Sequence, residues 1–162
     1  MNTHSSHDEA QCSGDAGESS DVRARLGAES ATARGVVLLR VHGEIDAYTL
    51  GRWRRLFGAA RTEAGRSGHL VIDVDDITFM SCRAIIELAE DAQRYRRSGG
   101  RVSIVSSGPS PIPRIIALAG LVEWLPVYAD GESATADRVP IRRASRTGPG
   151  SFHAAGLPRI PG

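Results

Sequence analysis

Residues 70–86 read LVIDVDDITFMSCRAII, and the changes of pattern within this stretch decide the fold. Residues 69–74 form an almost continuously apolar run, which is typical of a strand covered on both faces. The following residues, 75–81, read DDITFMS and predict a loop anchored in the core by Ile77 and Phe79. A helix should begin at the next residue, so the stretch predicts a buried strand, a loop and a helix in succession.

The helix expected from residue 82 has apolar residues at three- and four-residue spacing, the pattern of an amphipathic helix. Arginines are concentrated near the C-terminal end of this helix, where their positive charge interacts favourably with the helix dipole. Gly99 should end the helix. The predicted core face consists of Ile85, Ile86, Leu88, Ala89, Ala92 and Tyr95.

A second strand and helix come earlier in the chain. Residues 35–41 read GVVLLRV, a β-branched and leucine-rich run of strand length. Asp46 stands where a helix N-cap is expected, and a Gly/Ser turn at residues 65–68 follows the helix. The apolar face of that helix is predicted to be Leu50, Trp53, Phe57 and Ala60.

The flanking segments complete an alternation of strands and helices. Residues 22–26 alternate apolar and charged and predict a half-exposed edge strand, whereas residues 101–105 predict a buried one. Ser110 should cap a helix that has Pro111 at its first position, and residues 121–128 should form a turn and a short edge strand. This order predicts an α/β domain with a mixed or mostly parallel sheet and helices mainly on one face.

Composition sets the domain limits and excludes several classes of protein. The 162 residues are 41% hydrophobic and 24% charged, which rules out a collagen, a wholly disordered chain and a disulfide-dense toxin. Polar residues 1–20 and the Pro-, Gly- and Arg-rich residues 136–162 predict disordered tails around one domain at residues 21–135. The net charge of +1 argues against a protein built mainly to bind nucleic acid.

Location is inferred from features that the sequence lacks. No apolar run approaches the roughly 18 residues of a membrane-spanning helix, and the polar N-terminus does not resemble a secretory signal. We therefore expect a cytoplasmic protein that does not engage a membrane. Cys12 and Cys82 lie far apart in the chain, so reduced thiols are expected rather than a disulfide.

Three segments together resemble the STAS domain of bacterial anti-sigma factor antagonists. They read VVLLRVHGEIDAYT (residues 36–49), VIDVDDITFMSCRAII (residues 71–86) and GGRVSIVSSGPSPIPRIIALAGLVEWLPVY (residues 99–128). The resemblance implies a non-enzymatic protein that binds an anti-sigma factor, itself a histidine-kinase-like ATPase, and so releases a sigma factor. It further implies that a serine at the start of the second long helix is phosphorylated to weaken that complex. Such a helix start accommodates a phosphate well.

At that serine the sequence departs from the family pattern. Ser81 falls on the family's aspartate, Cys82 on the phosphorylated serine, Arg83 on a small residue and Ala84 on a glycine. A thiol is not the ordinary substrate of a serine kinase, so these residues argue against a phosphoswitch at this position. Three alternatives follow: an unregulated antagonist, a divergent STAS scaffold or sensor in a larger complex, and a redox sensor based on Cys82.

Residues near the two helix starts have alternative readings. Cys82 is a small packed residue, a thiol activated by the helix N-terminus and the adjacent arginine, or a relic of the acceptor position that still lies in the partner interface. Ser81 is either a helix cap or a displaced phosphoacceptor, and Asp46 is either a cap or a partner contact. The predicted partner surface consists of Asp46, Ala47, Tyr48, Thr49, Met80, Ser81, Cys82, Arg83, Ala84 and Ile85, with Glu87 and Asp91 as extensions.

No cofactor, metal or catalytic site is predicted. The side chains of Asp73, Asp75, Asp76 and His69 are of types that bind metal ions, but no second group of ligands accompanies them, so a solvated strand end is expected. The glycine-rich residues 106–111 lack the context of a nucleotide-binding loop.

Overall fold

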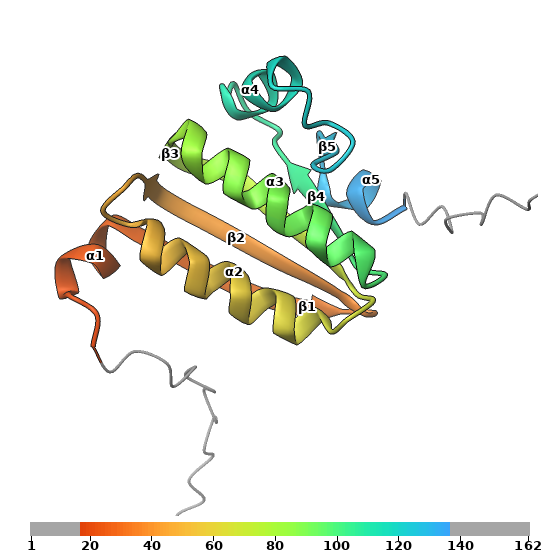
Figure 1. The fold of residues 1–162 in the computed structure, drawn as a ribbon, viewed down its shortest axis with the longest axis horizontal. Helices are drawn as coiled ribbons and strands as arrows, with labels where there is room; N and C mark the ends of the chain where they lie inside the picture. The colour runs from red at the N-terminus through yellow and green to blue at the C-terminus, as the bar shows by residue number, and fades with distance from the viewer. Residues whose placement is uncertain (1–16, 137–162) are drawn as a thin grey trace, which may run out of the picture.

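A five-stranded mixed sheet forms the centre of the structure, a computed structural model that describes residues 17–136 (Figure 1). The strands lie in chain order: β1 (Leu26–Ala33), β2 (Val36–Ile45), β3 (His69–Met80), β4 (Arg101–Val105) and β5 (Val127–Tyr128). β1 pairs with β2 in antiparallel fashion, and the other three pairings are parallel. The prediction of a mixed sheet in an α/β domain is confirmed.

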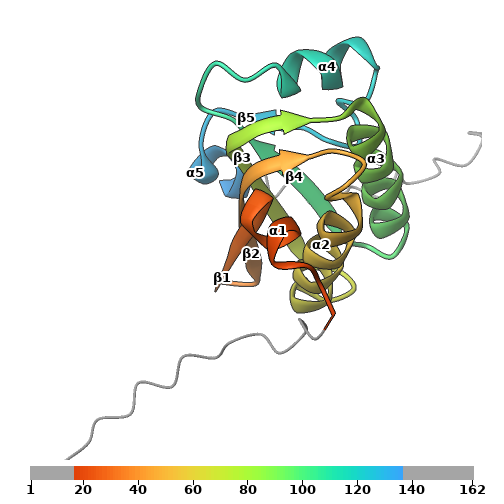
Figure 2. The ribbon, with the colours of Figure 1, turned by 90° about the vertical axis from the view of Figure 1, so that its left-hand side faces the viewer.

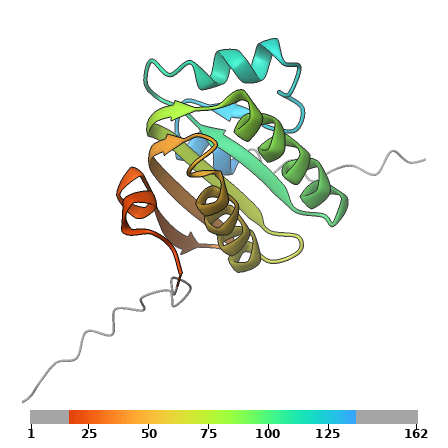
Figure 3. The same cartoon turned by 60° about the vertical axis from the view of Figure 1, so that its left-hand side comes forward.

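The helices lie mainly on one face of this sheet. They are α1 (Ser20–Arg25), α2 (Leu50–Ala64), α3 (Cys82–Arg97), α4 (Ile112–Leu118) and α5 (Gly131–Ala136). Figure 2 shows α2 and α3 on one side of the sheet and α5 on the other, and Figure 3 shows α2 and α3 side by side. This arrangement follows from the parallel strands, since each helix carries the chain back over the same face to begin the next strand.

The core fills the space between the sheet and the pair α2 and α3. All four residues predicted for the apolar face of α2 are buried, and the rings of Trp53 and Phe57 lie 5.9 Å apart. A smaller cluster on the opposite face contains Val71, Val105 and Ala134, the last of these on α5. That short helix was not predicted, because its sequence GESATA has almost no apolar residues to set a period.

The N-terminal edge of the sheet differs from the prediction. Residues 22–26 were expected to form a strand, but most of them belong to α1, whose first turn is capped by the side chain of Ser19. The edge strand is β1, a run of small residues without a clear alternation, which pairs along its whole length with β2. The predicted start of the domain at residue 21 falls inside α1, and the predicted tail at residues 136–162 lies outside the described residues except for Ala136.

The prediction of a loop at residues 75–81 was also wrong. β3 continues to Met80, because its pairing with β2 resumes after two register shifts. Ile77 is buried as expected, but Phe79 is 53% exposed and anchors nothing. Ile86 was likewise placed in the core by the prediction and is 49% exposed in the structure.

Two helix starts differ from the prediction by a few residues. α2 begins after Thr49, and Asp46 caps the preceding turn instead of the helix itself. α4 begins at Ile112 with Pro111 at the N-cap position, so its start lies one residue later than predicted; the Ser110 hydroxyl still accepts from the N–H of Ile112 at 3.3 Å. β5 confirms the short edge strand.

Candidate functional site

The sheet brings the two predicted contact segments together. β2 and β3 are parallel neighbours, and their last residues, Ile45 and Met80, face each other in the register. The N–H of Ser81 donates to the carbonyl oxygen of Ile45 at 2.8 Å. The loop at residues 46–49 and the start of α3 therefore lie side by side, at the carboxyl ends of the two parallel strands.

The loop at residues 46–49 is held by hydrogen bonds from Asp46 and Thr49. The Oδ1 of Asp46 accepts from the N–H groups of Tyr48 and Thr49, each at 2.9 Å. The Thr49 hydroxyl, which is completely buried, donates to the carbonyl of Glu44 at 2.6 Å and accepts from the N–H of Asp46 at 3.0 Å. The backbone N–H of Thr49 is the main cause that lowers the pKa of Asp46 below its usual value, so this loop is fixed with the carboxylate ionised.

Arg25, the last residue of α1, forms ion pairs and a ring contact that stabilise this loop. Its guanidinium lies 2.5 Å from a carboxylate oxygen of Glu44 and 3.0 Å from one of Asp46. The same guanidinium sits 5.5 Å from the centre of the Tyr48 ring, a cation–π distance. These contacts orient the half-exposed Tyr48 ring. The ring therefore stands in solvent on a loop whose position is fixed.

The start of α3 is capped by the residue before Cys82. Ser81 has extended backbone angles, and its hydroxyl accepts from the N–H of Ala84 at 3.2 Å, as an N-cap does. Of the two readings of Ser81, the structure therefore supports the cap. Cys82 follows as the first helical residue and its side chain is exposed, so the reading of Cys82 as a packed residue is wrong.

An ion-pair chain joins α2 and α3 beside Cys82. Arg54 on α2 donates to both oxygens of Glu87, at 3.0 and 2.8 Å, and Arg83 donates to Glu87 at 3.0 Å. The hydrogen bond from Arg54 is the main cause that lowers the pKa of Glu87. The chain of Arg54, Glu87 and Arg83 therefore has two guanidiniums around one carboxylate, and Asp91 also lies within electrostatic reach of Arg54.

The predicted contact residues divide into an exposed and a buried group. Ala47, Tyr48, Cys82 and Arg83 are exposed, and Asp46 and Ser81 are partly exposed. The side chains of Thr49, Met80, Ala84 and Ile85 are buried, so they support the surface and do not present themselves to a partner.

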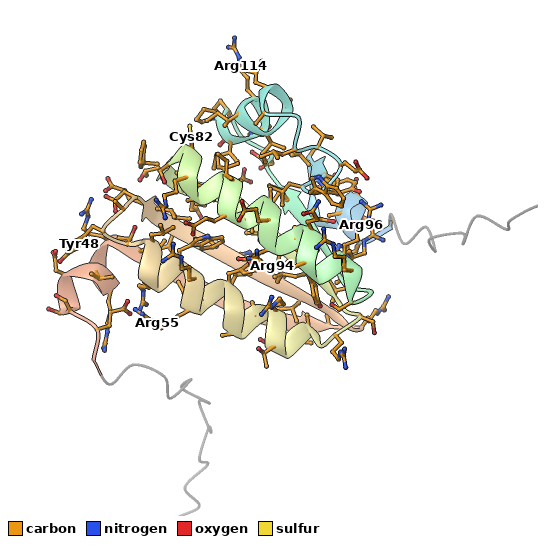
Figure 4. All side chains as sticks on the ribbon, in the orientation of Figure 1. Tyr48, Arg55, Cys82, Arg94, Arg96 and Arg114 are labelled. Atoms are coloured by element: carbon orange, nitrogen blue, oxygen red, sulfur yellow. The ribbon has the colours of Figure 1, made fainter. Side chains whose placement is uncertain are left out.

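Two apolar residues of this edge were missed by the sequence reasoning. Phe79 faces solvent from the end of β3, and Ile86 does so from the first turns of α3. Helical geometry supplied a signal for Ile86, because it lies about 100° around the helix from the buried Ile85. We call Tyr48, Phe79, Cys82, Arg83 and Ile86 the exposed edge; Figure 4 labels Tyr48 and Cys82 at this end of the fold.

The aspartates considered for a metal ion have other partners. Asp75 accepts from the Ser107 hydroxyl at 2.5 Å and from the N–H groups of Ser107 and Gly108 at 2.8 and 3.2 Å. Asp73 lies 3.7 Å from Arg40. Residues 17–136 contain no group of three or more His, Cys, Asp or Glu side chains suited to a metal ion. Within the same residues, no helix is both long and apolar enough to cross a membrane.

Comparison with known proteins agrees with this arrangement. A family model described as STAS domain matches residues 28–134. The chain belongs to the STAS family. The matched segment of this STAS domain includes every residue of the exposed edge, whereas α1 and its Arg25 precede the matched segment.

Several relatives of this STAS domain are named anti-sigma factor antagonists. The anti-sigma-F factor antagonist RsfA of Mycobacterium tuberculosis is 36% identical over 98 residues, which are 60% of this chain and 76% of RsfA. A crystal structure of an anti-sigma factor antagonist from Mycobacterium paratuberculosis has a TM-score of 0.59 and 27% identity, covering 68% of this chain and 92% of that one. The unphosphorylated antagonist SpoIIAA shares the fold, with a TM-score of 0.51 and 18% identity over 67% of this chain and 93% of that one.

Proposed function

We propose that this STAS domain is an anti-sigma factor antagonist, which binds an anti-sigma factor and so releases a sigma factor for transcription. The observation that carries the proposal is the exposed edge, where apolar side chains stand on a rigid frame. Tyr48, Phe79 and Ile86 are each about half exposed, while Thr49, Met80 and Ile85 beneath them are buried. Exposed apolar and aromatic groups on a fixed backbone are typical of a protein-binding surface.

The charge beside these apolar groups favours an acidic partner surface. Arg83 is 74% exposed in its side chain and Arg54 is 53% exposed, whereas Glu87 between them is 23% exposed. A partner that docks here would meet the two guanidiniums first. We therefore expect the matching surface of the anti-sigma factor to combine an apolar centre with carboxylates at its rim.

The partner we infer is an anti-sigma factor of the histidine-kinase-like ATPase class, and the site of action is the cytoplasm. The antagonist itself holds no cofactor and catalyses no reaction in this proposal. Relatives named as antagonists support the binding role. The resemblance of residues 71–86 to the family's phosphorylated segment supports the class of the partner.

Cys82 at the phosphoacceptor position makes this antagonist resistant to the usual phosphoswitch. Its thiol is exposed at the first residue of α3. The resemblance of residues 71–86 to the family pattern supports its alignment with the family's serine. The neighbouring Ser81 hydroxyl is engaged as the helix cap, so it does not replace the missing acceptor. Complex formation would then be controlled by the amount of the protein instead of by phosphorylation at this site.

A competition experiment tests the proposal. The purified protein is added to preformed complexes of each histidine-kinase-like anti-sigma factor of its host with a sigma factor, and free sigma factor is measured by size-exclusion chromatography. Release of a sigma factor in the presence of ATP, with no phosphate on Ser81 or Cys82 by mass spectrometry, supports the proposal. Binding only to proteins that are not kinase-like would favour the scaffold, and release that depends on reducing agent and is lost in Cys82→Ala would favour the redox sensor.

A further inference from the structure

A surface cavity of about 340 Å³ lies between the C-terminal ends of α2 and α3, away from the exposed edge. Its wall contains three arginines from separate segments: Arg61 on α2, Arg66 in the loop after α2, and Arg94 on α3. In Figure 4, Arg94 lies well along α3 from Cys82 at its start. The antagonist function proposed above uses none of these residues.

Positive charge in this cavity is incompletely neutralised. Arg94 pairs with Asp91 on its own helix at 2.6 Å. Neither Arg61 nor Arg66 forms an ion pair with any residue between 17 and 136. Guanidiniums near helix C-termini interact favourably with the helix dipole, but Arg66 lies beyond the end of α2, in the connecting loop. The dipole alone therefore does not account for three guanidiniums around one cavity.

The floor of the cavity is fixed by Tyr95. This tyrosine is 4% exposed, and its hydroxyl donates to the carbonyl of Gly65 at 2.5 Å. Gly100 makes room for the ring, because a Cβ there would lie 2.3 Å from a ring carbon. Ser98 adds a second tie, with its hydroxyl 3.2 Å from the carbonyl of Arg66. The loop that carries Arg66 is thus attached to α3 before any ligand arrives.

Electrostatics at Tyr95 agree with a positive cavity. Burial raises the pKa of the Tyr95 phenol above its usual value, and the backbone N–H of Gly68 and, to a smaller extent, the Arg61 guanidinium oppose that rise. Arg61 and Tyr95 both line the cavity, so the guanidinium lies near its floor.

We propose that this cavity binds a small molecule that carries two or more phosphate or carboxylate groups. Guanidiniums pair with both kinds of group through two parallel hydrogen bonds, and three of them suit a ligand with more than one anionic group. The volume is at the lower end of the range for small-molecule sites, roughly 300–1,000 Å³, so a compact ligand is expected.

Calorimetric titration with pyrophosphate, at constant ionic strength, tests this site; orthophosphate and citrate form parallel arms. Pyrophosphate should bind more tightly than orthophosphate, and Arg61→Gln and Arg66→Gln should each weaken it about tenfold or more. Arg114→Gln is the matched control, since Arg114 is an exposed arginine on α4, remote from the cavity (Figure 4), and it should change the affinity less than about twofold. The citrate arm distinguishes a carboxylate ligand from a phosphate ligand.

Two results would overturn the proposal. One is the absence of saturable binding by pyrophosphate and citrate. The other is an equal loss of affinity in Arg114→Gln and Arg66→Gln, which would indicate nonspecific attraction to a basic surface. Thermal unfolding of each variant verifies that the domain is folded, and sigma-factor release by the same variants separates this site from the antagonist function.

Discussion

Replacing Thr49 by valine tests whether the loop at residues 46–49 is held by the buried hydroxyl. Valine has the same shape as threonine but lacks the hydroxyl, so the carbonyl of Glu44 and the N–H of Asp46 both lose a partner. A group left without its hydrogen bond costs about 1–3 kcal/mol when it is buried. Since these two groups are only partly buried, we expect the free energy of unfolding to fall by about 2 kcal/mol in total. In a domain of this size that loss lowers Tm by about 8 °C.

Urea unfolding followed by circular dichroism measures this loss, and two further variants interpret it. Thr62→Val makes the same chemical change at an exposed site where the hydroxyl donates to Gly58 on its own helix, and it should cost less than about 0.5 kcal/mol. Thr49→Ser keeps the hydroxyl and loses one buried methyl group, which costs about 0.8 kcal/mol. A Thr49→Val protein as stable as Thr62→Val, or more stable than Thr49→Ser, would show that the buried hydroxyl does not hold the loop.

Three other perturbations follow from the same structure. Ser81→Ala should lower the free energy of unfolding by about 1 kcal/mol in a urea titration, whereas Ser81→Asp should retain most of it, because aspartate also caps helices. Gly43→Ala should lower Tm by more than either, because Gly43 has a φ of +101° and a Cβ would lie 2.1 Å from the carbonyl oxygen of Arg25; an unchanged Tm would contradict this. The Ser107 hydroxyl lowers the pKa of Asp75, so that stabilisation is present above the unfolded-state pKa near 3.8 and is lost as the pH falls through the lower folded-state value. Urea unfolding of Asp75→Asn should therefore show a smaller loss of stability on acidification than the unchanged protein, and identical pH profiles would contradict the assignment.

Hydrophobic periodicity predicted the elements that are long and buried. The apolar face of α2 and the strand at the start of β3 could be derived from spacing alone, because burial on one or both faces leaves a clear pattern. The edge of the sheet could not. β1 is built mostly from small residues, and its last five residues are exposed. Its sequence therefore has no pattern that distinguishes it from a loop.

The candidate site was predicted in position but not in detail. The resemblance at residues 71–86 located the start of α3, and the order of the strands places it beside residues 46–49. Which side chains face outward depends on the register of β2 and β3, which shifts twice before Ile45. Phe79 was therefore assigned to the core. The ion pair of Glu87 with Arg54 was not foreseen, because it joins two helices whose relative position only the packing determines. The pair of Arg83 with Glu87 lies within α3 at four-residue spacing, a signal that the sequence did contain.

Two matched substitutions test whether the exposed edge binds the anti-sigma factor. Ile86 and Val122 are 49% and 50% exposed, but Val122 lies in the turn after α4, next to Glu123 and Trp124, which contact Arg96 in the last turn of α3. Affinity for the anti-sigma factor is measured by calorimetry for Ile86→Asp and Val122→Asp. Ile86→Asp should weaken binding by about tenfold or more, and Val122→Asp should change it by less than about threefold. Equal effects of the two substitutions, or an effect of Val122→Asp alone, would contradict binding at the exposed edge.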